Sequence, residues 1–183
     1  MKTISRKVKP ARRIMGEIRV PGDKSISHRC VMIGSIARGK SVIKNFLNAE
    51  DCLATVDAFK NMGVRILTKG ANLIVEGVGL GGLRPPSKPL YVGNSGTTMR
   101  LLLGILAGQP FRAVLTGDDS LSKRPMKRVT GPLRMMGASI DGKDDANYAP
   151  LTVKGGKLQG ISYDSPIASA QVKSSLLFAG LYA

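Results

Sequence analysis

The sequence predicts an α/β fold assembled from a repeated unit of about 70 residues. One observation is spacing: Lys24, Gly96 and Ala168 each stand at the start of an apolar stretch of helical length, and successive members lie 72 residues apart. Another is a short motif, because Met62–Val64 (Met-Gly-Val) returns 74 residues later as Met136–Ala138 (Met-Gly-Ala). Self-similarity at a constant period indicates one supersecondary unit used repeatedly, each copy burying its faces against its neighbours.

The first unit is predicted to contain two helices followed by strands. Ser25 is a residue type that caps helices and precedes a mostly apolar stretch, so a helix is expected over Ile26–Ala37. A second helix is expected over Glu50–Met62, because apolar residues form one stripe along it and Gly63 ends it. Alternating apolar residues then predict strands over Val64–Thr68 and Leu73–Val78.

The second unit repeats this order, and a third is predicted to begin. We expect a strand over Leu90–Val92, an apolar helix over Thr97–Ala107, a strand over Phe111–Thr116 and an amphipathic helix over Pro125–Met136. Another apolar helix begins near Ser169, and the sequence ends within it. The expected content is therefore about two and a half units in a truncated chain.

The helices of one unit differ in character. Those near Ile26, Thr97 and Ala168 are apolar nearly all round and are expected to be buried, whereas the helices at Glu50 and Pro125 have a polar face and should lie outside. If the units are related by rotation, the amino-terminal ends of the buried helices converge. Their free N–H groups and the positive ends of their dipoles would then form a site for anions.

Charge supports an anionic partner. Lysine and arginine number 28 against 12 aspartates and glutamates, a formal net charge of +16 at pH 7. Aromatic residues make up only 4% and tryptophan is absent, so base-stacking surfaces for nucleic acid are not indicated and small phosphates or carboxylates are favoured. Many basic residues near the start are expected to belong to a solvated segment: Lys2, Arg6, Lys7, Lys9, Arg12 and Arg13.

Several classes of protein are disfavoured. No apolar run reaches the roughly 18 residues of a membrane helix, and no secretory signal is recognisable. Cys30 and Cys52 are too few for a disulfide scaffold and match no zinc motif, which suits a reducing cytoplasm. With a single histidine, a histidine-rich metal site is also disfavoured. The expectation is a cytoplasmic protein without metal, nucleic acid or membrane partner.

The start of each apolar helix contains residues that bind anions. In Pro21–Arg29 (PGDKSISHR), Lys24 is a point charge, the hydroxyl of Ser25 can donate, and Arg29 offers a bidentate fork one turn later. Cations at a helix amino terminus oppose the dipole unless an anion lies between them. His28 is expected to be a local hydrogen-bonding residue rather than a base.

The later helix starts follow the same pattern. In Gly93–Arg100 (GNSGTTMR) the glycines let the backbone approach a ligand, Thr97 or Thr98 is expected to cap, and Arg100 adds a cation. The stretch Ser122–Arg128 places four cations about a helix start. In Ser165–Lys173, the side chains of Ser169 and Gln171 are neutral hydrogen-bond donors.

Two glycine-rich motifs point to nucleotides but lack the required context. Gly34–Ser41 matches the Walker A pattern letter for letter, yet a helix is expected before it and a β-branched alternation after it, the reverse of a P-loop. A nucleotide hydrolase therefore stays as an alternative. Gly77–Gly82 fits G-x-G-x-x-G, but Leu83–Pro86 cannot open a helix, so a dinucleotide site is not expected.

Four motifs together, PGDKSISHR, GNSGTTMR, LSKRPMKR and SAQVKS, resemble the 5-enolpyruvylshikimate-3-phosphate (EPSP) synthases of the second bacterial class, over nearly the whole chain from about Ile14. The resemblance implies transfer of the enolpyruvyl group of phosphoenolpyruvate to the 5-hydroxyl of shikimate 3-phosphate, with release of phosphate and without metal or organic cofactor. It also implies an inside-out α/β barrel of βαβαββ units in two lobes. Residues 1–20 would then be a strand segment of the other lobe, and residues 21–183 an incomplete shikimate-3-phosphate-binding lobe.

The resemblance assigns roles by motif. Lys24 is the one catalytic candidate and would touch both substrates. The shikimate 3-phosphate set is Lys24, Ser25, Arg29, Ser169, Ala170 and Gln171, and the phosphoenolpyruvate set is Lys24, Asn94, Gly96, Arg124 and Gln171. Ala170 stands where the other class has a second serine. Gly96 is the glycine form of a position where alanine excludes glyphosate, so sensitivity of the full-length enzyme is expected.

The family's enzymes are well over twice as long as this chain, and their acid/base Asp and Glu pair has no counterpart here. We therefore expect the chain to bind substrate but to turn over negligibly alone, and to be complemented by a carboxy-terminal fragment. Two further alternatives are an enolpyruvyl transferase acting on a UDP-amino sugar, which should lack the DKSISHR loop, and a non-catalytic nucleic-acid binder.

Overall fold

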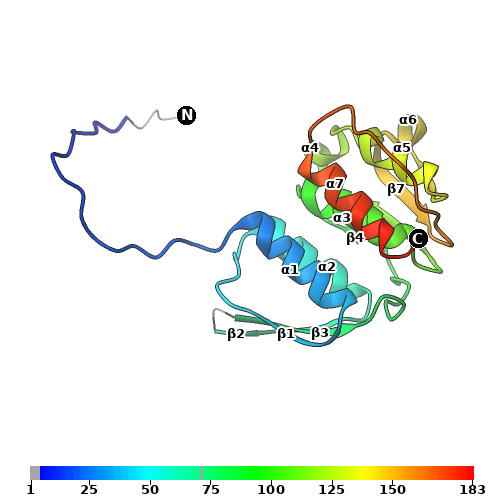
Figure 1. The fold of residues 1–183 in the computed structure, drawn as a ribbon, viewed down its shortest axis with the longest axis horizontal. Coiled ribbons are helices and arrows are strands. Elements are labelled where there is room, and N and C mark those ends of the chain that lie inside the picture. Colours follow the sequence, from blue (N-terminus) through cyan, green and yellow to red (C-terminus); the bar gives the residue numbers. More distant parts are fainter. Residues whose placement is uncertain (1–4, 71) are drawn as a thin grey trace.

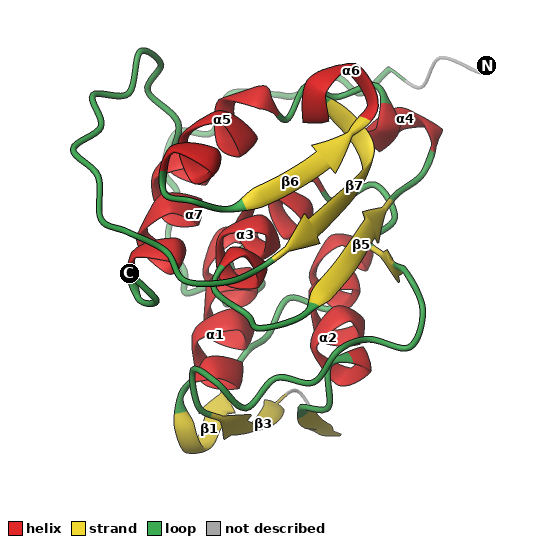
Figure 2. Ribbon diagram, turned by 90° about the vertical axis from the view of Figure 1, so that its right-hand side faces the viewer, coloured by secondary structure: helices red, strands yellow, loops and turns green. Residues whose placement is uncertain are grey.

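The computed structural model describes residues 5–70 and 72–183 and has an α/β fold with two sheets. One sheet has the order β1-β3-β2 and is antiparallel throughout. The other has the order β4-β5-β7-β6 and is mixed, because β4 and β5 are parallel whereas β7 is antiparallel to both its neighbours. Helices α1, α2 and α3 lie between the two sheets (Figure 2), so the core is helical and the sheets flank it.

The first unit contains the four predicted elements in the predicted order and one unpredicted strand, β1, between the two helices. These are α1 (Lys24–Ile36), β1 (Arg38–Ile43), α2 (Glu50–Asn61), β2 (Arg65–Lys69) and β3 (Asn72–Val78). The prediction that Ser25 caps the first helix is wrong. Asp23 is the cap, and its carboxylate accepts a hydrogen bond of 2.7 Å from the backbone N–H of Ile26. An aspartate accepts here as well as a serine does, and the chain turns into the helix two residues earlier than expected.

The second unit has more elements than the sequence predicts. It contains β4 (Leu90–Tyr91), α3 (Gly96–Ala107), β5 (Arg112–Thr116), α4 (Asp119–Ser122), α5 (Lys127–Met135), β6 (Ser139–Gly142), α6 (Lys143–Ala146) and β7 (Tyr148–Lys154). The unpredicted ones are α4, β6, α6 and β7. Helix α5 begins at Lys127, so Pro125 precedes it and is not in its first turn. Helix α7 (Ala170–Gly180) is the apolar helix expected after Ser169.

The internal repeat is visible in the backbone. Met62 follows α2 and Met136 follows α5, and the glycine after each has a positive φ, 88° and 99° respectively. The carbonyl of each methionine accepts a 2.9 Å hydrogen bond from a backbone N–H further along the chain. The donor is Arg84 for Met62 and Gln159 for Met136. The repeated Met-Gly pair therefore marks the same helix-ending turn twice.

Of the three helices predicted to be buried nearly all round, only α3 is buried to that extent. All residues of α3 except Thr97 are buried. Helices α1 and α7 bury one face each, and Ile26, Ile33 and Leu177 remain 62%, 54% and 64% exposed. A helix can be apolar all round and still have an exposed face when nothing in the described structure packs on that face.

Helices α1, α3 and α7 are parallel, with their amino-terminal ends at one end of the molecule (Figure 1). Contacts between α3 and α7 advance in the same direction along both: Gln171 bonds Thr97, Ser175 lies against Gly104, and Tyr182 lies against Gly108. Between α1 and α7, the guanidinium of Arg29 donates to the hydroxyl of Ser174 at 2.7 Å. The predicted convergence of helix starts is confirmed.

Residues 5–23 contain no helix or strand and extend away from the two sheets (Figure 1). The basic side chains expected to be solvated are exposed there, namely Arg6, Lys7, Lys9, Arg12 and Arg13. Lys2 lies outside the described residues. Within the described ranges, none of the helices is both long and apolar enough to cross a membrane.

Candidate functional site

The amino-terminal ends of α1, α3 and α7 are free of acidic residues in their first turns, as the structure describes them. Helices α2 and α4 differ, because their first turns contain Glu50, Asp51 and Asp119, whereas the first turn of α5 also lacks acidic residues. Carboxylates normally stabilise a helix amino terminus. Among the three converging helices, α1 is capped by the carboxylate of Asp23, whereas α3 and α7 are capped by serines, which leaves the positive ends of these two dipoles available to an anion from outside.

Lys24 is the first residue of α1 and forms an ion pair with the adjacent helix. Its Nζ lies 2.7 Å from Oδ2 of Asp51, in the first turn of α2. The hydrogen bond and charge of Asp51 raise the pKa of Lys24 above its ordinary value of 10.5, so the ammonium stays protonated at neutral pH. Roughly half of the Lys24 side chain is exposed, which leaves the ammonium within reach of a ligand.

Arg124 lies over the start of α3. Its guanidinium donates to the backbone carbonyl of Asn94 at 3.3 Å and to the side-chain oxygen of the same residue. The amide nitrogen of Asn94 in turn donates to Asp118 at 3.1 Å, the residue that caps α4. The structure thus brings together Asn94, Gly96 and Arg124, as the motifs predict, and Asp118 holds the asparagine in place.

Gly96 is the first residue of α3 and stands beside two guanidinium groups. A Cβ atom at this position would lie 2.8 Å from Nη1 of Arg100 and 3.4 Å from Nη1 of Arg124. Both arginines therefore approach the same short piece of backbone. Burial lowers the pKa of Arg100, and the positive charges of Arg128 and Arg124 lower it further. Two cations in this position are stabilised when an anion lies between them.

The start of α7 supplies neutral donors. Ser169 is its cap, and the hydroxyl accepts from the backbone N–H of Val172 at 3.4 Å. Ala170 is the first helical residue and is exposed. Gln171 donates to the hydroxyl of Thr97 at 3.0 Å and accepts from Arg100 at 2.8 Å. Helices α3 and α7 are therefore joined at the predicted site.

On α1, Ser25 and Arg29 lie one turn apart, as the sequence predicts. Arg29 donates to the backbone carbonyl of Ser25 at 3.0 Å, and its other terminal nitrogen reaches Ser174 on α7. Ser25 is exposed at the helix start, with its hydroxyl not used as the cap. Arg29 thus ties the beginning of α1 to α7 and stands at the edge of the site.

A buried chain of hydroxyl groups beneath the site was not predicted. Thr55 on α2 bonds His28 on α1 at 2.6 Å and Thr98 on α3 at 2.7 Å, and Thr98 bonds Ser95 at 2.7 Å. Ser95, rather than Thr97 or Thr98, caps α3. The prediction of a threonine cap is wrong, because the accepting oxygen belongs to the residue before the helix. No sequence signal separates Thr55 from a solvent-facing threonine.

His28 is fully buried and hydrogen-bonded, which confirms the prediction that it is a local bonding residue. Burial lowers its pKa to about 4, with a smaller contribution of the same sign from Lys24 and Arg29; the carboxylate of Asp51 opposes them. At neutral pH the imidazole is uncharged, so it adds no charge to the cation cluster.

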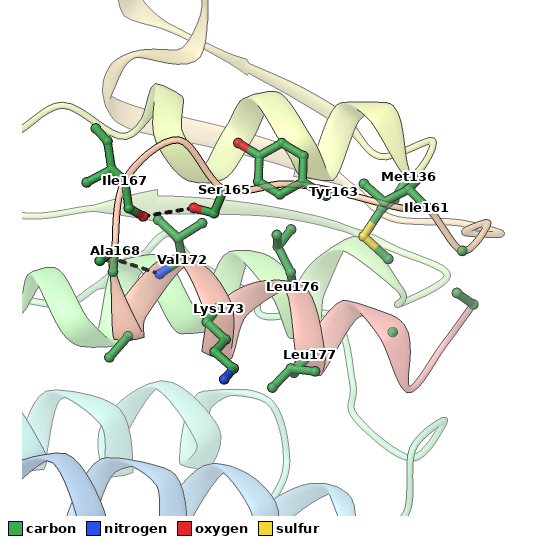
Figure 3. Close-up of a pocket in the computed structure, with 15 residues that line it drawn as sticks. Met136, Ile161, Tyr163, Ser165, Ile167, Ala168, Val172, Lys173, Leu176 and Leu177 are labelled. Atoms are coloured by element: carbon green, nitrogen blue, oxygen red, sulfur yellow. Dashed lines mark hydrogen bonds between the residues drawn. The ribbon is translucent and has the colours of Figure 1, made fainter.

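A cavity of about 1070 Å³ lies along α7. Its walls are mostly apolar, and Figure 3 shows Met136, Ile161, Tyr163 and Leu176 along them, whereas Lys173 points away from the methionine and the tyrosine. It reaches Ser169 and Ala170 at one end. Its chemistry is that of a packing surface, distinct from the cationic helix starts.

The structure also shows which elements surround the two glycine-rich motifs. Gly34–Ser41 spans the end of α1 and the start of β1, so the order is helix then strand, opposite to a P-loop. Gly77–Gly82 ends β3 and is followed by a segment without helix up to α3. In the described part of the chain, no group of at least three His, Cys, Asp or Glu side chains could hold a metal ion.

Comparison with known proteins identifies the family of the chain. The sequence profile of EPSP synthase (3-phosphoshikimate 1-carboxyvinyltransferase) matches residues 8–183. The 3-phosphoshikimate 1-carboxyvinyltransferase of Geobacillus thermodenitrificans is 62% identical over 169 residues, which cover 92% of this chain and 39% of that protein. The Geobacillus kaustophilus protein of the same name is 61% identical over 170 residues, covering 93% and 40%.

The structural comparison gives the same result. The solved EPSP synthase of Acinetobacter baumannii matches with a TM-score of 0.89 at 53% sequence identity, covering 92% of this chain and 38% of that one. The chain spans about two fifths of the length of the curated relatives it matches. A profile match over nearly the whole chain, together with these identities, shows the family: the chain belongs to the EPSP synthases.

Proposed function

We propose that this chain binds shikimate 3-phosphate and phosphoenolpyruvate, and provides part of the site at which the enolpyruvyl group passes to the 5-hydroxyl with release of phosphate. The single observation that supports this best is the convergence of three helix starts, whose first turns contain no acidic residue, with Lys24, Arg100 and Arg124. Both substrates are phosphorylated carboxylates, which such a cluster attracts through charge and backbone N–H groups.

We assign the two substrates to neighbouring parts of the site. Shikimate 3-phosphate would lie between α1 and α7, against Lys24, Ser25, Arg29, Ser169, Ala170 and Gln171. Phosphoenolpyruvate would lie at the start of α3, against Lys24, Asn94, Gly96, Arg124 and Gln171. The hydrogen bonds from Arg29 to Ser174 and from Gln171 to Thr97 support this division, because they place donors from different units side by side.

The reaction requires a proton to leave the attacking hydroxyl and a proton to reach the methylene carbon. Within this chain we propose Lys24 as the group that stabilises the developing negative charge and donates a proton, because its ammonium is protonated and about half exposed. The other acid/base groups would come from outside residues 1–183. We therefore propose that the chain binds substrates but has negligible turnover by itself.

We further propose that these elements form part of an inside-out α/β barrel of βαβαββ units. In that arrangement residues 1–20 belong to the other lobe and residues 21–183 to the shikimate-3-phosphate lobe, with a complementary carboxy-terminal part as partner. The helical core between two outer sheets supports the barrel proposal. The free cysteines Cys30 and Cys52 suit the cytoplasm as the compartment.

The proposal is tested by adding shikimate 3-phosphate to the isotope-labelled chain and following backbone amide signals. We expect saturable shifts at Ser25, Gly96 and Gln171. Lys24→Met should weaken the affinity roughly tenfold or more, as expected for loss of a charged hydrogen bond. Lys40→Met is the matched control: it removes one exposed lysine from the strand β1, outside the proposed site, and should leave the affinity unchanged.

The same pair of variants tests the hydrolase alternative. Magnesium-dependent ATP binding that is lost in Lys40→Met, with no response to shikimate 3-phosphate, would contradict our proposal. Phosphate release from the two substrates, measured with the chain alone, should stay at background. Turnover that Lys24→Met abolishes would show that the chain needs no complementary part.

A further inference from the structure

Arg100 is a buried cation without a buried carboxylate to neutralise it. The residue is 8% exposed, and the ion pairs found among the described residues do not include it. Its guanidinium donates instead to two neutral oxygens, Oε1 of Gln171 at 2.8 Å and the backbone carbonyl of Pro125 at 3.1 Å. Burying a charge against neutral partners is costly, so a residue retained in this state has a use beyond packing.

These two hydrogen bonds join three segments. Arg100 belongs to the first turns of α3, Gln171 opens α7, and Pro125 follows Arg124 directly in the loop before α5. The fork of a guanidinium has the rigid geometry needed to hold two acceptors at once. Arg100 therefore fixes the separation between the start of α7 and the loop from which Arg124 extends.

The bond to Gln171 also determines which way its amide faces. An amide side chain presents an oxygen on one side and an NH₂ group on the other. Because Arg100 can only donate, it selects the orientation in which Oε1 faces the guanidinium. The NH₂ group then faces Thr97, to which it donates at 3.0 Å, at the start of α3.

We propose that Arg100 is a positioning residue that locks the amide of Gln171 with its NH₂ group toward the start of α3, so that this side chain presents its donor, and not its acceptor, to an anionic ligand. The identity of that ligand as shikimate 3-phosphate rests on the function proposed above; the locking does not. In the opposite orientation the amide oxygen would face the anion and repel it.

The competing explanation is that Arg100 acts only through its charge. Arg128 allows the two to be separated. It is exposed, and its charge acts on the same guanidinium, since it contributes to the lowered pKa of Arg100. Removing either arginine changes the charge of the cluster equally, but only Arg100 bonds Gln171.

The first experiment needs no ligand. In the labelled chain, the side-chain NH₂ signals of Gln171 are followed by NMR in wild type, Arg100→Met, Arg100→Lys and Arg128→Met. We expect a rigid, dispersed NH₂ pair in wild type and Arg128→Met, and motionally averaged signals near random-coil positions in Arg100→Met. Arg100→Lys should restore part of the rigidity, because an ammonium reaches one of the two acceptors. Unchanged Gln171 signals in Arg100→Met would overturn the proposal.

The second experiment measures affinity for shikimate 3-phosphate. Arg100→Met should bind roughly tenfold or more weakly, and Arg128→Met less than about threefold, since it loses only screened charge. Equal losses in the two variants would mean that charge alone matters and would refute positioning. If wild type does not bind shikimate 3-phosphate, the proposed function fails, while the ligand-free NMR result still decides the role of Arg100.

A reciprocal variant tests whether misfolding could explain a loss of binding. Gln171→Glu keeps the shape of the side chain and gives Arg100 a carboxylate partner, so the melting temperature should stay the same or rise. The same change removes the NH₂ group and adds a negative charge, so binding of shikimate 3-phosphate should be lost. A Gln171→Glu chain that is folded and still binds with wild-type affinity would contradict the inference.

Discussion

The backbone of Gly104 in α3 lies directly against the backbone and hydroxyl of Ser175 in α7. A Cβ on Gly104 would come within 2.8 Å of the carbonyl carbon of Ser175 and 3.0 Å of its hydroxyl oxygen. Backbone cannot move aside as a flexible side chain can. The glycine therefore sets how closely the two parallel helices pack, and through them how closely Gln171 approaches Thr97 at their common end.

Gly104→Ala should accordingly lower the free energy of unfolding by about 1–3 kcal/mol, the usual cost of overpacking a dense core. Gly131→Ala is the control. It makes the same substitution inside helix α5, where a Cβ would meet nothing within 4 Å, and should raise stability by about 0.5–1 kcal/mol through helix propensity. Urea denaturation of both variants checks the pair, and a stabilised Gly104→Ala would show that α3 and α7 are not in close contact.

The capping of α1 can be tested at two neighbouring residues. Asp23→Ala should cost about 1 kcal/mol of unfolding free energy, because the N–H of Ile26 loses its acceptor. Ser25→Ala should change stability by less than about 0.5 kcal/mol, because its hydroxyl is not the cap. Chemical denaturation measures both. If Ser25→Ala lost more unfolding free energy than Asp23→Ala, Ser25 would be the cap, as the sequence predicts.

His28 should make the protein sensitive to acid. Its pKa is lowered to about 4 in the folded state, against an ordinary 6.5. Between these values the unfolded chain binds the proton and the folded chain does not, so stability is greatest above pH 6.5 and falls as the pH is lowered toward 4. The slope from this one group can reach about 1.4 kcal/mol per pH unit.

His28→Asn keeps a polar group near Thr55 but removes the titration. Its unfolding free energy, measured from pH 7 to pH 4, should therefore fall less steeply than that of wild type. The two curves should converge in acid. Parallel curves across this range would mean that His28 titrates in the folded protein as it does in the unfolded chain.

Gly96→Ala should weaken anion binding through Arg100. The added methyl would stand 2.8 Å from Nη1 of Arg100, the nitrogen that donates to Gln171, while Nη2 donates to Pro125. The arginine must therefore move and release at least one of these two acceptors. We expect affinity for phosphoenolpyruvate to fall roughly tenfold. The double variant with Arg100→Met should lose less than the sum of the two single losses, whereas additive losses would show that the methyl acts independently of Arg100.

The sequence predicts the architecture well where a residue type has one structural use. The glycines that follow methionine, Gly63 and Gly137, predict the end of a helix in both units and have a positive φ there, and the apolar helix α3 is buried as predicted. Lys24, Arg124 and Gln171 are brought to one end of the molecule, as the repeat predicts.

The predictions are wrong or incomplete where several neighbouring residues could have the same structural role. Asp23 and Ser25 are both good caps, as are Ser95 and Thr97, and only the chain's path decides between them. Strand β7 contains Pro150 and ends beside glycines, which obscures its alternation, and it is defined by pairing with β5 and β6 instead. Thr55 and Arg100 matter through partners on other helices, which no local pattern encodes.

The bonds of Gln171 connect residues 71 and 74 positions apart, and that of Arg29 spans 145 positions. Contacts of such sequence separation form after local helices and hairpins, because long loops must close first. A partly folded chain can thus have helical content without any competent site. During refolding, circular dichroism would follow the formation of helices, and ligand affinity would show when α7 docks.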